Sequence, residues 1–187
     1  MQQDVIQQTV ETIARTDCAT RGIAIFLAAV LVFVMVGGWL LIAYQEQARL
    51  SIATVVRLAC IFGFSYIVGK ILGHIVIDPR PYIVEHVAPL MPVATDNGFP
   101  SDHTLLASAL TATMWWLRRR WSIVFVLGTV LVMLGRLGVG AHHTLDVMGS
   151  VVIVLVVSII VGLVPLPARW NCSWRVIARR VFQGSHS

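Results

Sequence analysis

Long apolar runs dominate the chain and predict an all-α fold, a polytopic bundle of transmembrane helices. The first run, residues 22–44, carries no charge and is long enough to cross a bilayer, which takes about 20 helical residues. Three consecutive arginines at residues 118–120 split a later stretch in two, so its halves are predicted to form a helical hairpin. The pattern predicts about five spans in all. After the first run they are residues 52–77, 104–117, 121–137 and 145–163.

The two ends of the chain are more polar than this core. In residues 1–21 apolar side chains recur at helical spacing among polar ones, which predicts an amphipathic helix on the outer surface or packed against the bundle. A frayed polar tail is the alternative. Residues 165–187 are basic and are predicted to form a cytoplasmic tail. The chain is therefore predicted to be a single membrane domain, residues 1–187, with its transmembrane core at residues 22–164.

Composition supports a membrane protein. Hydrophobic residues make up 57% of the 187 residues and charged residues only 12%, and the mean hydropathy is +0.82, which excludes a separate soluble domain of any size. The three cysteines are far apart and show no CxxC spacing, so neither a disulfide framework nor a zinc cluster is indicated. The net charge of +5 is best interpreted through the positions of the basic residues, and no nucleic-acid partner is expected.

The charges are distributed unevenly between the two sides of the predicted bundle. Nine of the 14 lysines and arginines fall on one side, which the positive-inside rule makes cytoplasmic. Eight of the nine carboxylates fall on the other side. This pattern predicts a multi-pass protein of the cytoplasmic (inner) membrane with its N-terminus outside. The outer, periplasmic face would carry the polar loop at residues 78–103 and the turn at residues 136–142.

Five of the six histidines lie at or near the outer ends of the predicted spans. Ionisable groups at this depth must be paired or hydrated, so their gathering indicates a functional site. The clearest segment places His142 six residues after Arg136 and four before Asp146, one helical turn. Asp146 can then hold one ring nitrogen of His142 and leave the other as a nucleophile. Two alternatives are a helix-capping pair and a metal site that includes His143, but no further ligand stands at suitable spacing, so no metal is expected.

Two earlier segments carry complementary chemistry. Ser101 or Asp102 can cap a helix whose free amides would bind an anion, and His103 in the same turn is placed to protonate a leaving oxygen. Arg80 stands between two prolines, and its fixed delocalised charge suits the oxygens of a phosphate. An ordinary helix cap and a solvated helix end are the simpler interpretations of these two segments.

In this order the three segments resemble the type 2 phosphatidic acid phosphatase superfamily of membrane lipid phosphatases. That family's pattern is K-x6-R-P, then P-S-x-H, then S-R-x5-H-x3-D, and the match covers residues 70–146. Two positions depart from it. Gly73 stands where the family has lysine, which makes Lys70, one turn away, the candidate phosphate ligand and His74 a second one. Gly135 stands where the third motif usually has serine.

The resemblance implies a function and a set of roles. Within the superfamily the chain looks most like bacterial undecaprenyl-diphosphatases, which remove one phosphate from the polyprenyl carrier of cell-wall synthesis. His142 would be the nucleophile, Asp146 its partner and His103 the general acid. The implied partners are a lipid diphosphate and membrane lipids, with no cofactor, no metal and no specified oligomeric state. The residues implied to bind phosphate are Arg80, Arg136, Ser101, Lys70 and Asp102.

Other functions fit the same residues. A phosphatase acting on phosphatidylglycerol phosphate or phosphatidate would need no different core residues, and neither would a lipid phosphotransferase. A non-catalytic membrane protein that kept the scaffold is the alternative outside the enzymes. The absence of a motif histidine would favour this alternative, but His103 and His142 are both present. Only the glycine at position 73 favours a non-catalytic protein.

Overall fold

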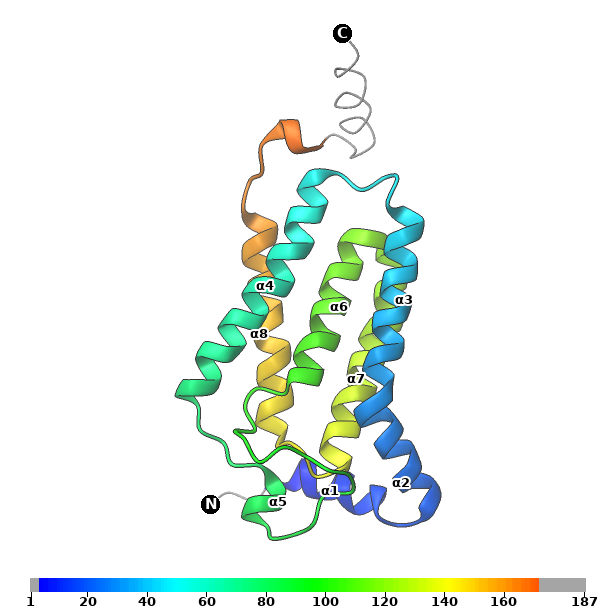
Figure 1. The fold of residues 1–187 in the computed structure, drawn as a ribbon, viewed down its shortest axis with the longest axis vertical. Coiled ribbons are helices and arrows are strands. Elements are labelled where there is room, and N and C mark those ends of the chain that lie inside the picture. Colours follow the sequence, from blue (N-terminus) through cyan, green and yellow to red (C-terminus); the bar gives the residue numbers. More distant parts are fainter. Residues whose placement is uncertain (1–3, 172–187) are drawn as a thin grey trace.

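The computed structural model describes residues 4–171, and every regular element in that range is a helix (Figure 1). The predicted all-α class is confirmed. The elements in chain order are α1 (Val5–Ala14), α2 (Cys18–Ile25), the π-helical segment η1 (Phe26–Val30), α3 (Leu31–Glu46), α4 (Ile52–Ile75), α5 (Pro81–Val84), α6 (Asp102–Arg118), the 3-10 turn η2 (Arg119–Trp121), α7 (Ser122–Gly138), α8 (Thr144–Leu163) and the 3-10 turn η3 (Ala168–Asn171).

Four helical runs within the described residues are long and apolar enough to cross a membrane. The third of them, Asp102–Gly138, is 37 residues long but does not continue straight. Its backbone leaves the helical conformation at Arg118, with φ −160° and ψ 85°, and α7 returns beside α6. A hydrogen bond of 2.8 Å joins Thr111 Oγ1 of α6 to Thr129 Oγ1 of α7. The arginine-rich break therefore forms the predicted hairpin, and α6 and α7 are two separate segments of the bundle.

Helix α6 is the centre of the bundle and contacts α3, α4, α7 and α8 (Figure 1). Small side chains let its neighbours approach closely, because Ala107, Ala109 and Thr113 are almost completely buried. Large apolar residues on the outer helices point away from the bundle, as with Leu41 at 58% exposure. Apolar side chains that face outward from every long helix are what a lipid-exposed surface requires.

The first span contains a π-helical turn where it meets α7. A Cβ atom at Gly135 would lie 2.5 Å from the backbone nitrogen of Ala28 in η1. The two backbones are therefore in direct contact, and only glycine leaves room for it. This contact fixes the last turn of α7, from which Arg136 projects.

At the N-terminus, α1 ends at Ala14 and the spanning helix begins at Cys18 behind a capping box at Asp17. Residues 18–21, predicted as part of the amphipathic segment, thus belong to the first spanning helix. Helix α1 packs on α7 through a polar face that buries Gln7 and Glu11, which are hydrogen-bonded to each other.

Apolar side chains of α1 such as Val5, Ile6 and Ile13 are exposed. Asp4, ahead of the helix, accepts hydrogen bonds from the backbone and the hydroxyl of Thr144 at the start of α8. At the other end of the chain, the predicted basic tail lies outside the described residues from position 172 onward.

Candidate active site

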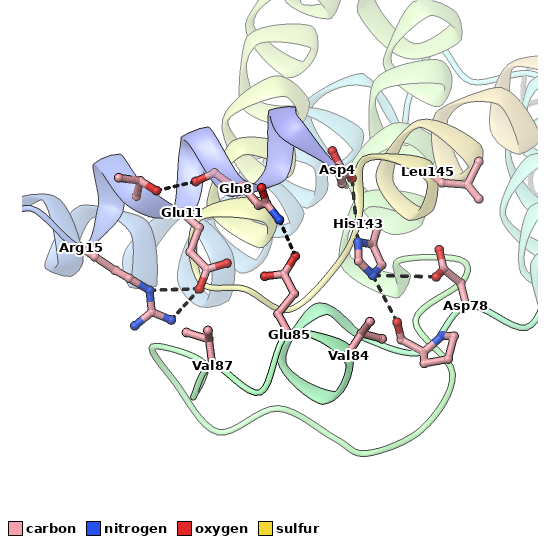
Figure 2. A pocket seen from close by; sticks show the side chains of 12 residues that line it. Asp4, Gln8, Glu11, Arg15, Asp78, Val84, Glu85, Val87, His143 and Leu145 are labelled. Atoms are coloured by element: carbon pink, nitrogen blue, oxygen red, sulfur yellow. Dashed lines mark hydrogen bonds and ion pairs between the residues drawn. The ribbon is translucent and has the colours of Figure 1, made fainter. Parts of the chain in front are cut away.

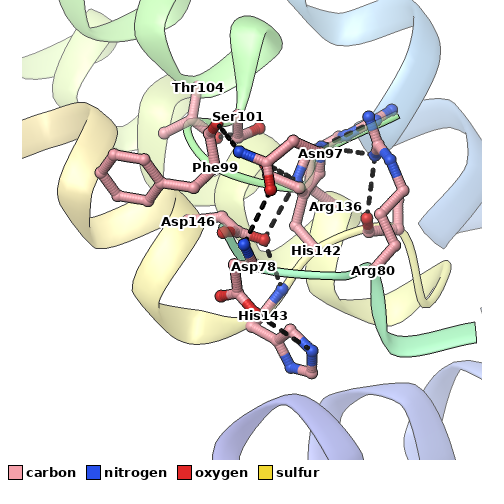
Figure 3. Close-up of polar contacts among 12 residues, drawn as sticks. Asp78, Arg80, Asn97, Phe99, Ser101, Thr104, Arg136, His142, His143 and Asp146 are labelled. Atoms are coloured by element: carbon pink, nitrogen blue, oxygen red, sulfur yellow. Dashed lines mark hydrogen bonds and ion pairs between the residues drawn. The ribbon is translucent and has the colours of Figure 1, made fainter. Parts of the chain in front are cut away.

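The three predicted segments meet at one end of the bundle, the end that carries α1 and α5; we call it the α1 end (Figures 1 and 3). They surround a cavity of about 540 Å³ between α4, α6 and the loop that precedes α6. Six of the eight predicted site residues line this cavity, namely Lys70, Arg80, Asp102, His103, Arg136 and His142. A pattern spread over 77 residues of sequence, from position 70 to position 146, is thus brought into one place.

His142 lies in the turn between α7 and α8 and is 2% exposed. Its Nδ1 is 3.0 Å from the carbonyl oxygen of Gly98 and 3.3 Å from Oδ2 of Asp146. Both partners are acceptors, so the hydrogen-bond network assigns the proton to Nδ1 and leaves Nε2 unprotonated. Burial, together with the charges of Arg136 and Arg80, lowers the pKa of His142 well below its usual value. The neutral imidazole therefore persists into acidic solution.

Two guanidinium groups donate hydrogen bonds to the unprotonated Nε2 of His142. Arg80 Nη1 lies 3.3 Å from Nε2, and Arg136 Nη2 lies 3.1 Å from it. Both arginines are 6% exposed. Arg136 is also short of a partner, because within residues 4–171 its buried Nε makes no hydrogen bond. A site with two buried positive charges and an unsatisfied donor suits an anion.

Arg80 is held in place by the loop before α6 and by the turn before α8. Its Nη1 donates to the carbonyl oxygen of Ala141 at 3.0 Å, and its Nη2 donates to Oδ1 of Asp96 at 2.6 Å. The hydrogen bond from Arg80 lowers the pKa of the Asp96 carboxyl, which stays ionised. Asp96 is mostly exposed, with a side-chain exposure of 69%, so this ion pair lies at the mouth of the site.

His103 and Lys70 reach the cavity from α6 and α4. His103 lies in the first turn of α6 and packs edge-on against Phe33 of the first span, with 6.5 Å between ring centroids. Lys70 Nζ forms an ion pair with Oδ1 of Asp102 at 3.2 Å. Lys70 therefore lines the site despite its displacement from the family position. At that position a Cβ on Gly73 would lie 2.9 Å from the carbonyl oxygen of Phe99, so a lysine would not fit without a backbone shift.

Two predicted residues do not line the cavity. Asp146 is completely buried behind His142 and contacts it from the far side. Ser101 is also completely buried; its hydroxyl accepts a hydrogen bond of 3.1 Å from Thr104, and its carbonyl accepts one of 3.1 Å from Ser150. The serine joins α6 to α8, and its hydroxyl is directed to protein neighbours.

Asn97 is a residue that the motif analysis did not single out. Its side-chain Nδ2 lies 2.8 Å from the carbonyl oxygens of Gly73 and Val76 and 2.9 Å from that of Phe99, and its Oδ1 accepts from the backbone of Asp78 at 2.7 Å (Figure 3). The end of α4 is thereby tied to the loop that supplies the Gly98 carbonyl to His142. The Asn-Gly pair in the sequence marks a turn, but its partners 19 to 24 residues away are visible only in the structure.

Replacing Asn97 with aspartate is expected to destabilise the protein by about 2–4 kcal/mol, because a carboxylate would face three carbonyl oxygens with no donor between them. Thermal unfolding in detergent measures this loss of stability. The matched control is Asn171→Asp in η3, at the opposite end of the bundle (Figure 1). An unfolding midpoint for Asn97→Asp equal to that of the control would contradict the role of Asn97.

A second, larger cavity of about 990 Å³ lies between α1, α5 and the start of α8 (Figure 2). Its charged lining is mostly acidic, with Asp4, Glu11, Asp78 and Glu85, although Arg15 and His143 also line it. Several of these groups are already paired, as when Gln8 donates to Glu85 at 3.1 Å. The lining does not include Arg80, Arg136 or His142. The smaller cavity is therefore the candidate active site despite its size.

The sequence model of the PAP2 superfamily matches residues 54–170, and the chain belongs to that superfamily. This confirms the superfamily predicted from the three segments. Together with the apolar helices it identifies a multi-pass membrane protein.

The chain is similar to the undecaprenyl-diphosphatase BcrC of Bacillus subtilis (strain 168), with 36% identity over 104 residues, covering 54% of this chain and 52% of that protein. It is 28% identical over 113 residues to an undecaprenyl-diphosphatase of Sulfolobus acidocaldarius, covering 59% of this chain and 53% of that protein. The matches thus span about half the length of these curated relatives. Among solved structures, LpxE of Aquifex aeolicus has a similar fold, with a TM-score of 0.61 at 19% identity over 83% of this chain and 92% of that one.

Proposed function

We propose that this protein is a phosphatase that removes the terminal phosphate of a polyprenyl diphosphate, undecaprenyl diphosphate being the specific candidate, through a phosphohistidine intermediate. The observation that carries the proposal is the state of His142. Its unprotonated Nε2 lies between two guanidinium groups, while Nδ1 is held by Asp146 and Gly98. A neutral, oriented nucleophile beside two fixed positive charges suits attack on a phosphorus atom.

In the first step, Nε2 of His142 attacks the terminal phosphorus in line with the bridging oxygen. The bond from nitrogen to phosphorus forms as the bond to the bridging oxygen breaks, and the electron pair leaves with the lipid monophosphate. Arg80 and Arg136 stabilise the charge on the transferring phosphoryl oxygens, and Lys70 assists from α4. His103 donates a proton to the departing oxygen, and Asp146 stabilises the charge that develops on the imidazole.

In the second step, water attacks the phosphohistidine and His142 leaves as a neutral imidazole. His103, deprotonated by the first step, accepts a proton from this water. Inorganic phosphate is released and the starting protonation states are restored. Both steps use side chains that line one cavity, apart from Asp146, which acts through its contact with His142.

A lipid substrate is supported by the position of the cavity at the end of an apolar bundle and by the names of the relatives. An outward-facing site is supported by the distribution of arginines. The α3–α4 connection and the α6–α7 hairpin, which carry Arg49, Arg118, Arg119 and Arg120, lie at the opposite end from the site (Figure 1). The positive-inside rule assigns that arginine-rich end to the cytoplasm.

Phosphate release by detergent-purified protein tests the proposal. Undecaprenyl diphosphate, phosphatidylglycerol phosphate and phosphatidate are compared with EDTA present. We expect activity that resists EDTA, with the polyprenyl diphosphate preferred by about tenfold or more in kcat/KM. Preference for a glycerolipid would keep the chemistry and contradict the carrier substrate. No release from any of the three by folded protein would contradict the function itself.

A further inference from the structure

Asp78 lies directly behind the candidate active site, in the turn that follows α4 (Figure 3). Its backbone is fixed on both sides, because its N–H donates to Asn97 Oδ1 at 2.7 Å and its carbonyl accepts from Gly98 at 2.8 Å. Its side chain is partly buried, with an exposure of 21%. Asp78 therefore presents a carboxyl group at a defined position, and neither the motif pattern nor the mechanism above uses it.

The hydrogen bonds of Asp146 are incomplete on one side. Oδ2 accepts from Nδ1 of His142 at 3.3 Å and from the backbone of His143 at 2.9 Å. Oδ1 is buried, and no donor within residues 4–171 bonds to it. A buried carboxylate oxygen without a donor is costly, so a missing proton donor is indicated at this atom.

Gly98 brings the two residues together, because its N–H donates to the carbonyl of Asp78 and a Cβ on it would lie 2.9 Å from Oδ2 of Asp146. The carboxyl groups of Asp78 and Asp146 therefore lie side by side (Figure 3). Two ionised carboxylates in contact repel each other, whereas one shared proton turns the contact into a hydrogen bond. We propose that Asp78 is a positioning residue for His142: its protonated carboxyl group donates a hydrogen bond to Asp146 and so holds Asp146 against Nδ1 of His142. This inference rests on the proposed function of His142 as the nucleophile.

The other charges near Asp78 come from two elements. His143, at the start of α8, places Nε2 3.9 Å from Oδ1 of Asp78, and Asp4 ahead of α1 lies on the far side of His143. Burial, followed by the charge of Asp146, raises the pKa of Asp78 to about 6, although His143 opposes the shift. Asp78 therefore holds a proton below about pH 6 and loses this proton as the pH rises above that value. Loss of the proton leaves Asp146 without its donor and adds repulsion between the two carboxylates.

The test compares kcat and KM between pH 5 and pH 8 for wild type, Asp78→Asn and Asp78→Leu. Asparagine keeps a donor toward Asp146 at every pH, whereas leucine has none. In wild type we expect kcat to fall as the pH rises through about 6. Asp78→Asn should keep kcat within about threefold of the low-pH wild-type value and lose this fall, and Asp78→Leu should lower kcat by about tenfold or more throughout. KM should change little in either variant.

Glu85→Gln is the control variant. It neutralises a carboxylate that accepts a hydrogen bond from Gln8 and that lies just after α5. Its pH profile should coincide with that of wild type. The proposal is overturned if Asp78→Asn keeps the wild-type pH profile of kcat, or if its kcat is as low as that of Asp78→Leu at every pH.

An infrared difference spectrum at pH 5, wild type minus Asp78→Asn, tests the protonation of the carboxyl group without an activity assay. A protonated carboxyl band is expected there, and its absence also overturns the proposal. A wild-type protein with this band but no phosphatase activity would instead contradict the proposed function.

Discussion

Replacement of His142 by asparagine is expected to lower phosphate release by at least about 1,000-fold, because the variant has no nucleophile to form the covalent intermediate. Asparagine can still donate to the Gly98 carbonyl, so the fold should be retained. The loss should therefore appear in kcat, with the thermal unfolding midpoint close to that of wild type. Residual activity would reflect the two arginines acting on a direct attack by water.

The measurement uses substrate labelled in its terminal phosphate. The reaction is stopped rapidly without acid, and label bound covalently to the protein is then detected. Wild type should carry label that is lost in acid and stable in base, as a phosphohistidine requires. Label should form at pH 5.5 as well as at pH 7, because burial and the adjacent arginines lower the pKa of His142 and keep it neutral. His86→Asn is the matched control: His86 is exposed in the loop after α5, and its φ of 57° suits asparagine. Normal release by His142→Asn would exclude the phosphohistidine mechanism.

Introducing the family serine at position 135 is expected to destabilise this protein by about 3 kcal/mol or more. A Cβ there would lie 2.5 Å from the backbone nitrogen of Ala28 and 2.6 Å from the carbonyl carbon of Leu27. Backbone atoms cannot rotate away as a flexible side chain can, so the first span would have to move. Because Arg136 is the next residue, activity should fall with stability.

Thermal unfolding of Gly135→Ser is compared with that of Gly128→Ser, two turns earlier on the same helix. A Cβ at Gly128 would meet the sulfur of Met35 at 2.9 Å, and this flexible side chain can change rotamer. Gly128→Ser should therefore lower the free energy of unfolding by about 1 kcal/mol or less. Equal unfolding midpoints for the two variants would show that the contact between α7 and η1 is not as tight as described.

Much of the bundle and of the candidate site could be predicted because the signals are local. Apolar runs mark the spans, and the arginines at residues 118–120 mark the hairpin. The spacing of His142 and Asp146 predicts contact between them, and the structure has Nδ1 of His142 3.3 Å from Oδ2 of Asp146. His142 itself lies just before α8 and not on a helical turn. These features depend on residues close together in the chain, where periodicity and turn chemistry suffice.

The rest depends on contacts between distant segments. The glycines at positions 73 and 135 look like lost functional groups in the sequence, whereas in the structure each makes room for a neighbouring backbone. Asn97 and Asp78 carry no motif, and their importance comes from partners that only the fold brings near. The contact of Ser101 with phosphate stays a prediction from its motif, and the structure adds that its buried hydroxyl accepts a hydrogen bond from Thr104.

The contact between Asp4 and Thr144 also bears on how the protein is made. These residues are 140 positions apart, and their hydrogen bonds join α1 to the start of α8, next to His142. During synthesis α1 leaves the ribosome before α8 does. The hydrogen bonds between Asp4 and Thr144 can therefore form only after the start of α8 has emerged. The turn that bears His142 is completed only at that stage, so a partly inserted chain holds no finished site.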